Sequence, residues 1–357
     1  MAEGVRNIES LSLFFTAGVA AGTVLTTPSA GLLLPFLALP YFLQKRMVRW
    51  PEKWSAGILL ATFLLLGIFC ARNAALPVAD GESWMEALAA GAALKLKALI
   101  GGIPFPSTGT APLLKALLTG DRSGLPPETV AVFRQSGASH LLALSGLHMG
   151  ILYLIFDALT KTLGNSPSAR FIRFGLILSA ALFFTLMTGA GPSIVRAFLF
   201  IVLNETLRLL RRPRKATRVF CVALLIQLAL DPAVIRSLGF QLSYLAMAGI
   251  FLVYPILEKW YPEGSRFNPL RWLWNSAALA ISCQLFTAPL AWIRFHTFPR
   301  YFLLTNLLAI PLTTVLMGTA VATVILSAAG LCPALLITAT DGLGRLLLWV
   351  LEVISSM

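Results

Sequence analysis

A succession of long apolar segments runs through most of this chain and constrains its fold more than any other feature. A helix needs about 20 predominantly apolar residues to cross the hydrocarbon core of a bilayer. Segments near this length alternate with short polar connections, which predicts an all-α fold, a polytopic integral membrane helical bundle. We expect eleven spans, at residues 11–27, 29–43, 55–70, 139–160, 172–190, 192–210, 217–230, 238–257, 272–292, 301–328 and 332–354.

The composition argues against a large soluble enzyme. Only 12% of the 357 residues are charged and 57% are hydrophobic, whereas soluble domains average about 25% charged residues. The net charge of +13 fits contact with nucleic acid or anionic lipid, but basic cytoplasmic loops alone would also produce it. None of the four cysteines shows Cys-x-x-Cys spacing, so we expect free, buried thiols.

The spacing of the apolar segments divides the chain into three regions. We expect N-terminal membrane helices over 1–83, an outward amphipathic and loop region over 84–138, and a helical membrane core over 139–357.

The middle region differs in character from the spans. Residues 84–100 mix large apolar and charged side chains, as an interfacial amphipathic helix does. Residues 101–112 are rich in Gly and Pro and predict a loop. Pro127 and Glu128 suit the first turn of a further helix within 125–138.

The distribution of basic residues predicts the orientation. With eleven spans, the side that holds the N-terminus carries 17 Lys and Arg residues, and the other side carries nine. Cytoplasmic loops are enriched in Lys and Arg. We therefore expect a cytoplasmic N-terminus, with the C-terminus and region 84–138 facing outward.

Polar residues within 140–150 stand out because this segment is otherwise apolar enough to enter a membrane. Two of the three histidines, His140 and His148, lie here with Ser145. On one continuous helix the three side chains would share nearly the same side, and Gly146 would admit a close neighbour. The spacing favours a polar stripe along a pore and a close-packed helix about equally.

The pair Ser145 and His148 could also be a nucleophile and its base. Such a pair needs an orienting acid and an oxyanion hole, and neither Asp121 nor Asp157 is well placed. We expect no enzymatic activity, and keep a membrane-embedded Ser/His hydrolase as an alternative. Three histidines without a His-Glu-x-x-His motif also predict no metal site and no cofactor.

A second group of polar residues interrupts the apolar runs near residue 190. Gly191, Pro192 and Ser193 break the chain, and Arg196 follows about one turn into the next span. An arginine there is costly unless it snorkels to the interface, pairs with an acid or faces a wet cavity. We favour a fixed positive charge on the path of an anionic polymer over simple snorkelling.

Two more groups lie in the later spans. Gln241 and Ser243 sit early in 238–257, where capping of a tight outer loop explains them equally well. Pro289 and Pro311 are expected to kink or break two spans, and Asn306 could satisfy a freed backbone group. Hydrogen bonding between helices is the simpler alternative.

In this order the motifs resemble the competence domain of the ComEC-type competence family, the membrane channel of natural transformation. The resemblance covers residues 112–328 and runs through Gly120-Asp121-Arg122, Phe133 to Gly150, Gly191 to Ala197, Asp231-Pro232 with Gly239 to Ser243, Pro289, and Asn306 to Pro311. It implies substrate contacts from Asp121, Arg122, His140, Ser145, Gly146, His148, Pro192, Ser193, Arg196, Gln241, Ser243, Asn306 and Pro311.

The resemblance implies a channel that takes single-stranded DNA inward across the bacterial cytoplasmic membrane. Family members often carry OB-like and metallo-β-lactamase-like domains, and this sequence has neither the space nor the histidines for them. We therefore expect a minimal or excised channel core that lies in membrane lipid and works with a separate nuclease and a DNA receptor. The chain lacks a phosphate-binding Gly-x-x-x-x-Gly-Lys motif, so a cytosolic ATP-driven motor is also expected. A homodimer and transport of another anionic solute stay open.

Overall fold

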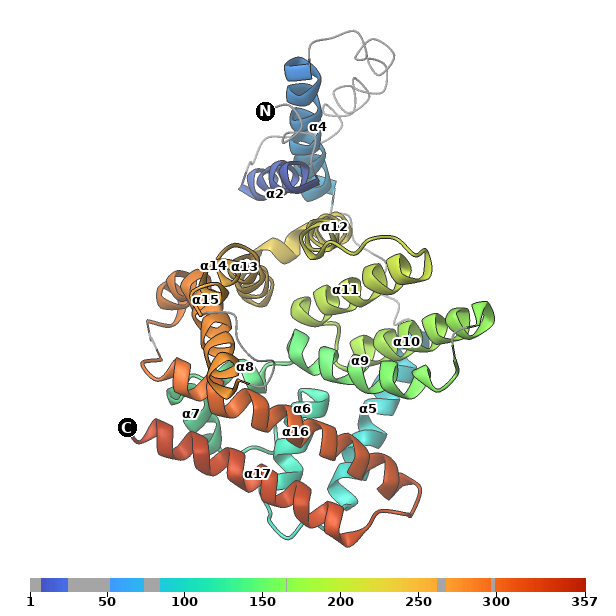
Figure 1. Cartoon of the computed structure of the whole chain (residues 1–357), viewed down its shortest axis with the longest axis vertical. Coiled ribbons are helices and arrows are strands. Elements are labelled where there is room, and N and C mark those ends of the chain that lie inside the picture. Colours follow the sequence, from blue (N-terminus) through green and yellow to red (C-terminus); the bar gives the residue numbers. More distant parts are fainter. Residues whose placement is uncertain (1–7, 25–51, 74–83, 165, 262–267, 297–298) are drawn as a thin grey trace. The chain divides into compact units, whose positions relative to one another are not determined.

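The computed structural model describes residues 8–24, 52–73, 84–164, 166–261, 268–296 and 299–357 (Figure 1). Within these ranges every regular element is a helix, in agreement with the predicted all-α class. The expected span 29–43 lies outside the described residues.

The chain forms two compact units. Residues 1–82 and 199–241 make the first unit, and residues 83–198 and 242–357 make the second. The boundaries fall inside two helices, α11 (Pro192–Leu209) and α13 (Leu238–Leu252), so each of these contributes to both units.

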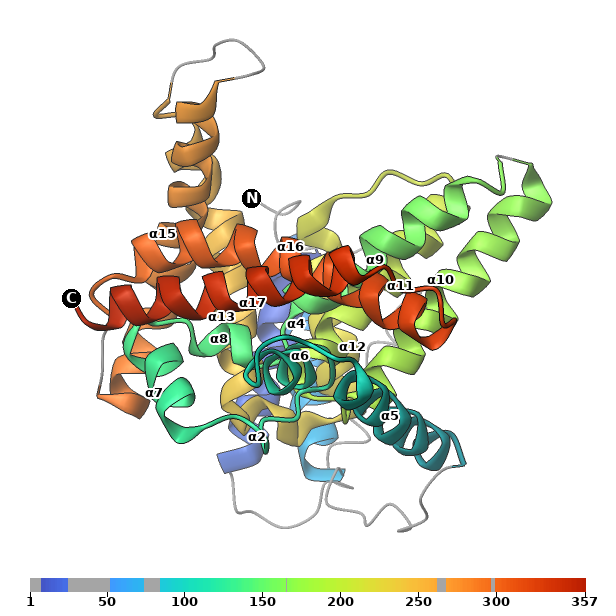
Figure 2. The same ribbon diagram turned by 90° about the horizontal axis from the view of Figure 1, so that it is seen from below.

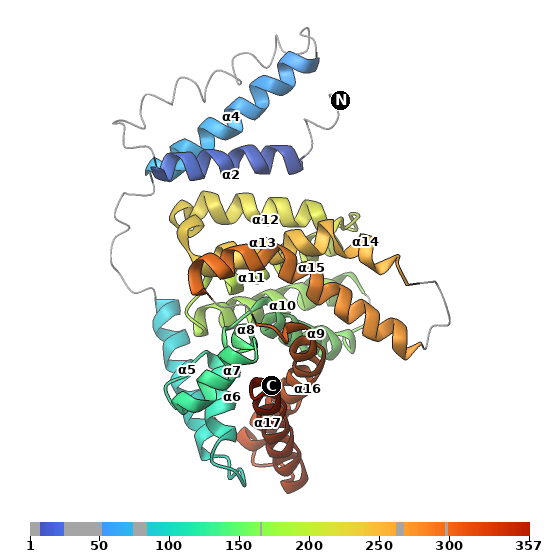
Figure 3. The ribbon, with the colours of Figure 1, turned by 90° about the vertical axis from the view of Figure 1, so that its left-hand side faces the viewer.

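The first unit is built on a helical hairpin. Its helices α2 (Ile8–Val24) and α4 (Glu52–Asn73) lie side by side (Figure 3). A side chain at Gly18 would collide with the α4 backbone, because an added Cβ would lie 2.0 Å from the Leu64 carbonyl oxygen. Helix α12 (Ala216–Leu230) packs on α2, and the 3₁₀ helix η2 (Pro232–Arg236) follows it.

The second unit holds most of the helices. They are α5 (Trp84–Gly102), α6 (Thr110–Thr119), α7 (Pro127–Gln135), α8 (Ser139–Leu142), α9 (Gly146–Lys161), α10 (Pro167–Met187), α14 (Tyr254–Glu258), α15 (Pro269–Phe295), α16 (Phe302–Ala328) and α17 (Ala334–Ser355), together with the nearer parts of α11 and α13.

Five stretches of the described residues are long and apolar enough to cross a bilayer. They are Pro167–Met187, Leu238–Glu258, Pro269–Phe295, Phe302–Ala328 and Ala334–Ser355, and each matches an expected span to within a few residues. Large apolar side chains on these helices point outward, such as Ile293 at 66%, Ile325 at 57% and Leu335 at 80% exposure. Lipid is the medium in which such surfaces are stable, because hydrocarbon solvates them at no cost.

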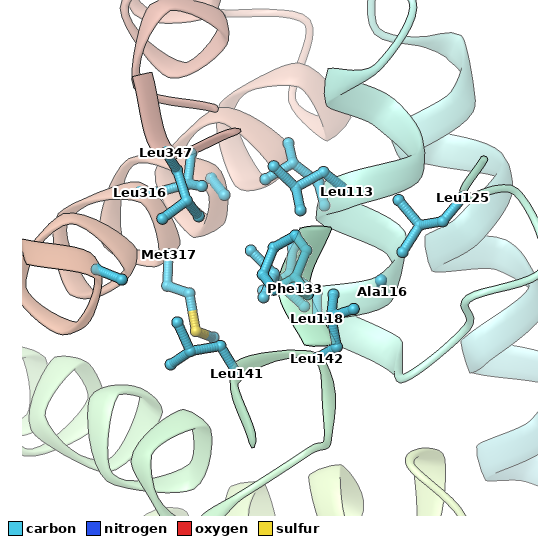
Figure 4. Packing of buried hydrophobic residues seen from close by; sticks show 14 of the residues in the cluster. Leu113, Ala116, Leu118, Leu125, Phe133, Leu141, Leu142, Leu316, Met317 and Leu347 are labelled. Carbon is cyan, nitrogen blue, oxygen red and sulfur yellow. The ribbon is translucent and has the colours of Figure 1, made fainter. Parts of the chain in front are cut away.

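The core of the second unit forms around α6, a short helix within the region expected to be an outward surface. Leu113 and Leu117 of α6 and Phe133 of α7 are fully buried against Leu316 and Leu347 of α16 and α17 (Figure 4 shows the cluster). The loop expected over 101–112 is shorter than predicted, because α5 continues to Gly102 and α6 begins at Thr110. Apolar residues spaced for one helical face explain this difference.

Helix α6 crosses the paired helices α16 and α17 rather than running along them. Figure 2 shows α16 and α17 lengthwise and α6 end-on. The start of α6 is tied to α17 by Asp341, whose buried carboxylate accepts hydrogen bonds from the Thr110 hydroxyl (2.6 Å), the Ser107 amide (3.1 Å) and the Ser107 hydroxyl. A carboxylate at the positive end of a helix is electrostatically favourable.

One expectation about helix continuity is wrong, and a second, that two prolines kink or break their spans, is wrong for the breaks. The single helix expected over 139–160 is two helices, α8 and α9, because Ala143 and Ser145 adopt extended backbone conformations between them. Pro289 and Pro311 do not end their helices, since α15 and α16 continue past them as single helices. Neighbouring helices can support a proline inside a membrane span.

Candidate functional site

The break between α8 and α9 separates the two histidines that the sequence placed on one stripe. His140 lies on α8 with an exposed side chain, and its Nδ1 is 3.2 Å from the Gly137 carbonyl oxygen. His148 lies in the first turn of α9 and is fully buried. His140, Ser145 and His148 therefore do not lie on one continuous helix, although the two histidines remain within electrostatic range of each other.

Ser145 and His148 form a capping box at the start of α9. The Ser145 hydroxyl accepts a hydrogen bond from the Leu147 amide at 3.3 Å. In return, His148 Nδ1 accepts one from the Ser145 amide at 3.2 Å and lies 3.1 Å from Ser145 Oγ. In most capping boxes Glu or Gln accepts the second bond, so His148 takes the place of that residue. The pair that resembles a nucleophile and base thus has a structural task.

Arg196 on α11 reaches the same helix end. A Cβ added to Gly146 would lie 3.1 Å from Arg196 Nη2, so the guanidinium rests directly on the backbone that opens α9. Its central carbon lies 5.9 Å from the ring centroid of Tyr244 on α13, within cation–π range. Arg196 is only 8% exposed and Tyr244 only 7%. Three helices therefore meet at one buried positive charge.

The Gly120-Asp121-Arg122 turn approaches the break from its other end. Arg122 Nε donates to the Leu142 carbonyl oxygen at 3.1 Å, although the side chain is otherwise exposed. Gly120 has a φ of 78°, and a Cβ there would lie 2.6 Å from Leu144 Cδ1. The turn thus packs on the segment that leads into Ser145.

Asp121 itself stabilises this turn. Its carboxylate lies 2.8 Å from Lys97 Nζ on α5 and accepts hydrogen bonds from the amide (3.0 Å) and hydroxyl (2.6 Å) of Ser123. The hydrogen bond from Lys97, and after it those from Ser123, hold the pKa of the Asp121 carboxyl below its usual range. The Asp121 carboxylate is therefore paired with Lys97 and stabilises the local fold.

The remaining predicted residues are spread along the chain. Pro192 opens α11, and Ser193 follows it one turn before Arg196. Gln241 donates from Nε2 to the Ile235 carbonyl oxygen at 2.7 Å, which ties the start of α13 to η2 within the first unit.

The other three residues lie in long helices of the second unit. Ser243 is half-buried on α13, next to Tyr244. Asn306 is half-buried on α16, and Pro311 lies inside the same helix.

Three residues that the structure makes notable were not predicted as site residues from the sequence. Tyr244 directly follows Ser243, which was predicted, and an aromatic ring at that place could have indicated a cation–π partner. Cys283 on α15 lies within electrostatic range of Arg196. Asp341 is an acid inside an apolar run, a feature that by itself marks a site of interest in a membrane helix.

Comparison with known proteins places this arrangement in a family. The family model described as "Competence protein" matches residues 117–357, which include the α8–α9 break and Arg196. Among curated relatives, "ComE operon protein 3" of Bacillus subtilis (strain 168) is 29% identical over 213 residues, which are 59% of this chain and 25% of the relative.

Two other relatives give the same result. "Recombination protein 2" of Haemophilus influenzae is 28% identical over 216 residues, 57% of this chain and 27% of that protein. "Competence protein ComA" of Neisseria gonorrhoeae is 30% identical over 175 residues, 47% of this chain and 25% of that protein. The chain thus spans about a quarter of the length of these relatives. No solved structure matches the chain.

The family match covers well over half of the sequence and coincides with the five span-length stretches outlined above. The protein is therefore a multi-pass membrane protein that belongs to the ComEC-type competence protein family.

Proposed function

We propose that the protein takes part in DNA uptake during competence as the membrane channel for a single DNA strand. The observation that carries this proposal is the buried guanidinium of Arg196, held where α9, α11 and α13 meet. A charge inside a membrane bundle is expensive to bury and usually marks the path of an ion or substrate.

The surroundings of Arg196 favour an anionic substrate. The guanidinium rests on the N-terminal end of α9, which is the positive end of the helix dipole. The Arg196 guanidinium and the positive end of α9 thus lie together in a buried site, and a bound anion would stabilise this arrangement. The exposed Arg122 adds a second cation at the other end of the α8–α9 break. Phosphodiesters are recognised by such arginines, which can bind two oxygens at once.

The finer features of the channel are part of this proposal. They are eleven spans in the bacterial cytoplasmic membrane, an internal N-terminus, an external C-terminus, and dependence on a separate nuclease, DNA receptor and ATP-driven motor. The excess of basic residues on one side of the predicted topology supports the orientation. A homodimer belongs to the same group of proposals.

We also propose that the chain transports its substrate without transforming it. The described residues contain no group of three or more His, Cys, Asp and Glu side chains arranged to hold a metal ion. The Ser145 hydroxyl and His148 Nδ1 cap the start of α9. A hydrolase would instead need Ser145 as a free nucleophile, so labelling of Ser145 by a fluorophosphonate, lost in Ser145→Ala, would favour that alternative.

The proposal is tested by complementing a deletion strain of the native host with Arg196 variants at matched membrane levels. We expect Arg196→Lys to retain part of the uptake of labelled DNA, Arg196→Met to lose about tenfold or more, and Arg196→Glu to lose all of it. Arg218→Met, which removes an exposed charge from the first turn of α12, is the matched control and should leave uptake unchanged. Normal uptake in Arg196→Glu, or in the deletion strain itself, would contradict the proposal.

A further inference from the structure

The aromatic ring of Tyr244 lies beside the Arg196 guanidinium, whose central carbon is 5.9 Å from the ring centroid. It comes from α13, while Arg196 comes from α11 and the backbone on its other side comes from α9. Both side chains are at least nine-tenths buried. The guanidinium is thus clamped between an aromatic ring and a helix end.

A ring beside a guanidinium can hold the arginine in one orientation. A cation–π contact uses the flat face of the guanidinium, whereas phosphate oxygens bind to the N–H groups in its plane. The two interactions are therefore compatible, and one can orient the group for the other. A lysine would lack the flat face that the ring holds.

We propose that Tyr244 is a positioning residue that holds Arg196 by a cation–π stack, so that the guanidinium presents its in-plane donors to the phosphodiester backbone of the passing strand. This inference rests on the proposed function for its substrate, but the stack itself is testable without DNA.

An experiment can separate the effect of the electron density of the Tyr244 ring on Arg196 from the effect of the ring's shape. Phe at position 244 keeps the stacking face, and fluorinated phenylalanines keep nearly the same shape while their rings lose electron density. If the stack positions Arg196, DNA uptake should stay near normal in Tyr244→Phe and decline stepwise with the number of fluorine atoms, by about tenfold in total. A purely packing role predicts equal uptake across the fluorinated series, with loss only in Tyr244→Ala.

Cys283 supplies a readout that does not depend on transport. It lies on α15, half-buried and within electrostatic range of Arg196. In a variant with the other three cysteines changed to serine, Cys283 is the one remaining thiol. The ratio of its reaction rates with anionic and cationic methanethiosulfonates reports the local potential, because the ratio cancels the fraction of thiolate.

We expect purified protein to show a ratio that favours the anionic reagent and that falls several-fold in Arg196→Met. Tyr244→Phe should keep the ratio, while Tyr244→Leu should lower it toward the Arg196→Met value because the guanidinium is no longer held. An unchanged ratio in Tyr244→Leu would overturn the positioning role. Failure of both reagents to react with Cys283 in every variant would also overturn it, because the proposal requires that an anion can reach this place.

The two experiments separate the possible failures. A ratio that responds to Tyr244 while uptake ignores both Tyr244 and Arg196 would keep the stack and remove the proposed channel function. Uptake that depends on Arg196 but is equal across the fluorinated series would keep the channel function and remove the role of Tyr244.

Discussion

The capping box of α9 leads to a prediction that separates structure from chemistry at His148. His148 accepts the Ser145 amide through Nδ1 at 3.2 Å, which is the task of Glu or Gln at the third helical position of other capping boxes. Gln has an acceptor oxygen at the end of a side chain of similar reach. We therefore expect His148→Gln to fold and function, with a stability loss below about 1 kcal/mol.

The magnitude for the damaging change follows from burial. His148 is fully buried, so His148→Ala leaves both a cavity and an amide without its acceptor. Together these should cost about 2–4 kcal/mol. Ser145→Ala, which removes only the first half of the box, should cost about 1 kcal/mol, and Ser145→Asn should restore most of that because Asn is a good N-cap residue.

Thermal unfolding of the purified protein in detergent measures these differences, and DNA uptake at matched membrane levels measures their consequence. If His148 transfers protons or Ser145 acts as a nucleophile, His148→Gln and Ser145→Asn would be as inactive as the alanine variants despite normal stability. That result would refute the capping account.

Three further predictions concern packing and charge, each checked by the same unfolding measurement. Gly249→Ala should destabilise the protein by about 2 kcal/mol, because the added Cβ would lie 2.1 Å from a backbone carbonyl oxygen of α15. Gly318→Ala should instead stabilise α16 by up to about 1 kcal/mol, because no atom lies within 4 Å of the added Cβ. Equal effects of the two substitutions would contradict the close α13–α15 crossing. Asp341→Leu should cost about 3 kcal/mol, because the Ser107 amide loses its acceptor and the Ser107 and Thr110 hydroxyls keep only their 2.7 Å contact with each other; Asp341→Asn should cost clearly less. A neutral Asp341→Leu would show that the link to α6 does not stabilise the fold. Lys97→Met should lower the free energy of unfolding by less than about 1 kcal/mol. Because the pKa of Asp121 is lowered in the folded protein, this loss should persist from neutral pH to below pH ~4 and vanish only in stronger acid. Disappearance of the loss near pH 5 would contradict the ion pair.

Much of the helical framework was predictable from the sequence because hydrocarbon leaves few alternatives to a helix. Segments 192–210, 217–230 and 301–328 correspond closely to α11, α12 and α16. Helix α6 escaped prediction because its ten residues are too short for a span and follow a Gly- and Pro-rich loop. Only its contacts with α16 and α17 make it the centre of a core, and such contacts are invisible in one sequence.

Four of the residues predicted for the site come together in the structure, but their roles could not be predicted from the sequence. Ser145, Gly146, His148 and Arg196 do converge, but the histidine that was expected to line a stripe caps a helix. Periodicity could not reveal this, because a two-residue extended break between α8 and α9 changes the direction of every later side chain. Tyr244 went unnoticed because its role depends on the packing of α13 against α11, which no local pattern encodes.

The central claim is that a DNA strand passes Arg196 on its way through the membrane. A photoreactive azidophenylalanine at Ser193, one helical turn from Arg196, would report this directly. The matched control carries the same group at Ile325, which is 57% exposed on the apolar surface of α16. DNA with a bulky block at one end, added to competent cells, stalls in transit and is then irradiated. We predict crosslinks to DNA at position 193 that disappear in Arg196→Glu, and none at position 325; normal DNA entry without crosslinking at 193, or equal crosslinking at both positions, would contradict the account.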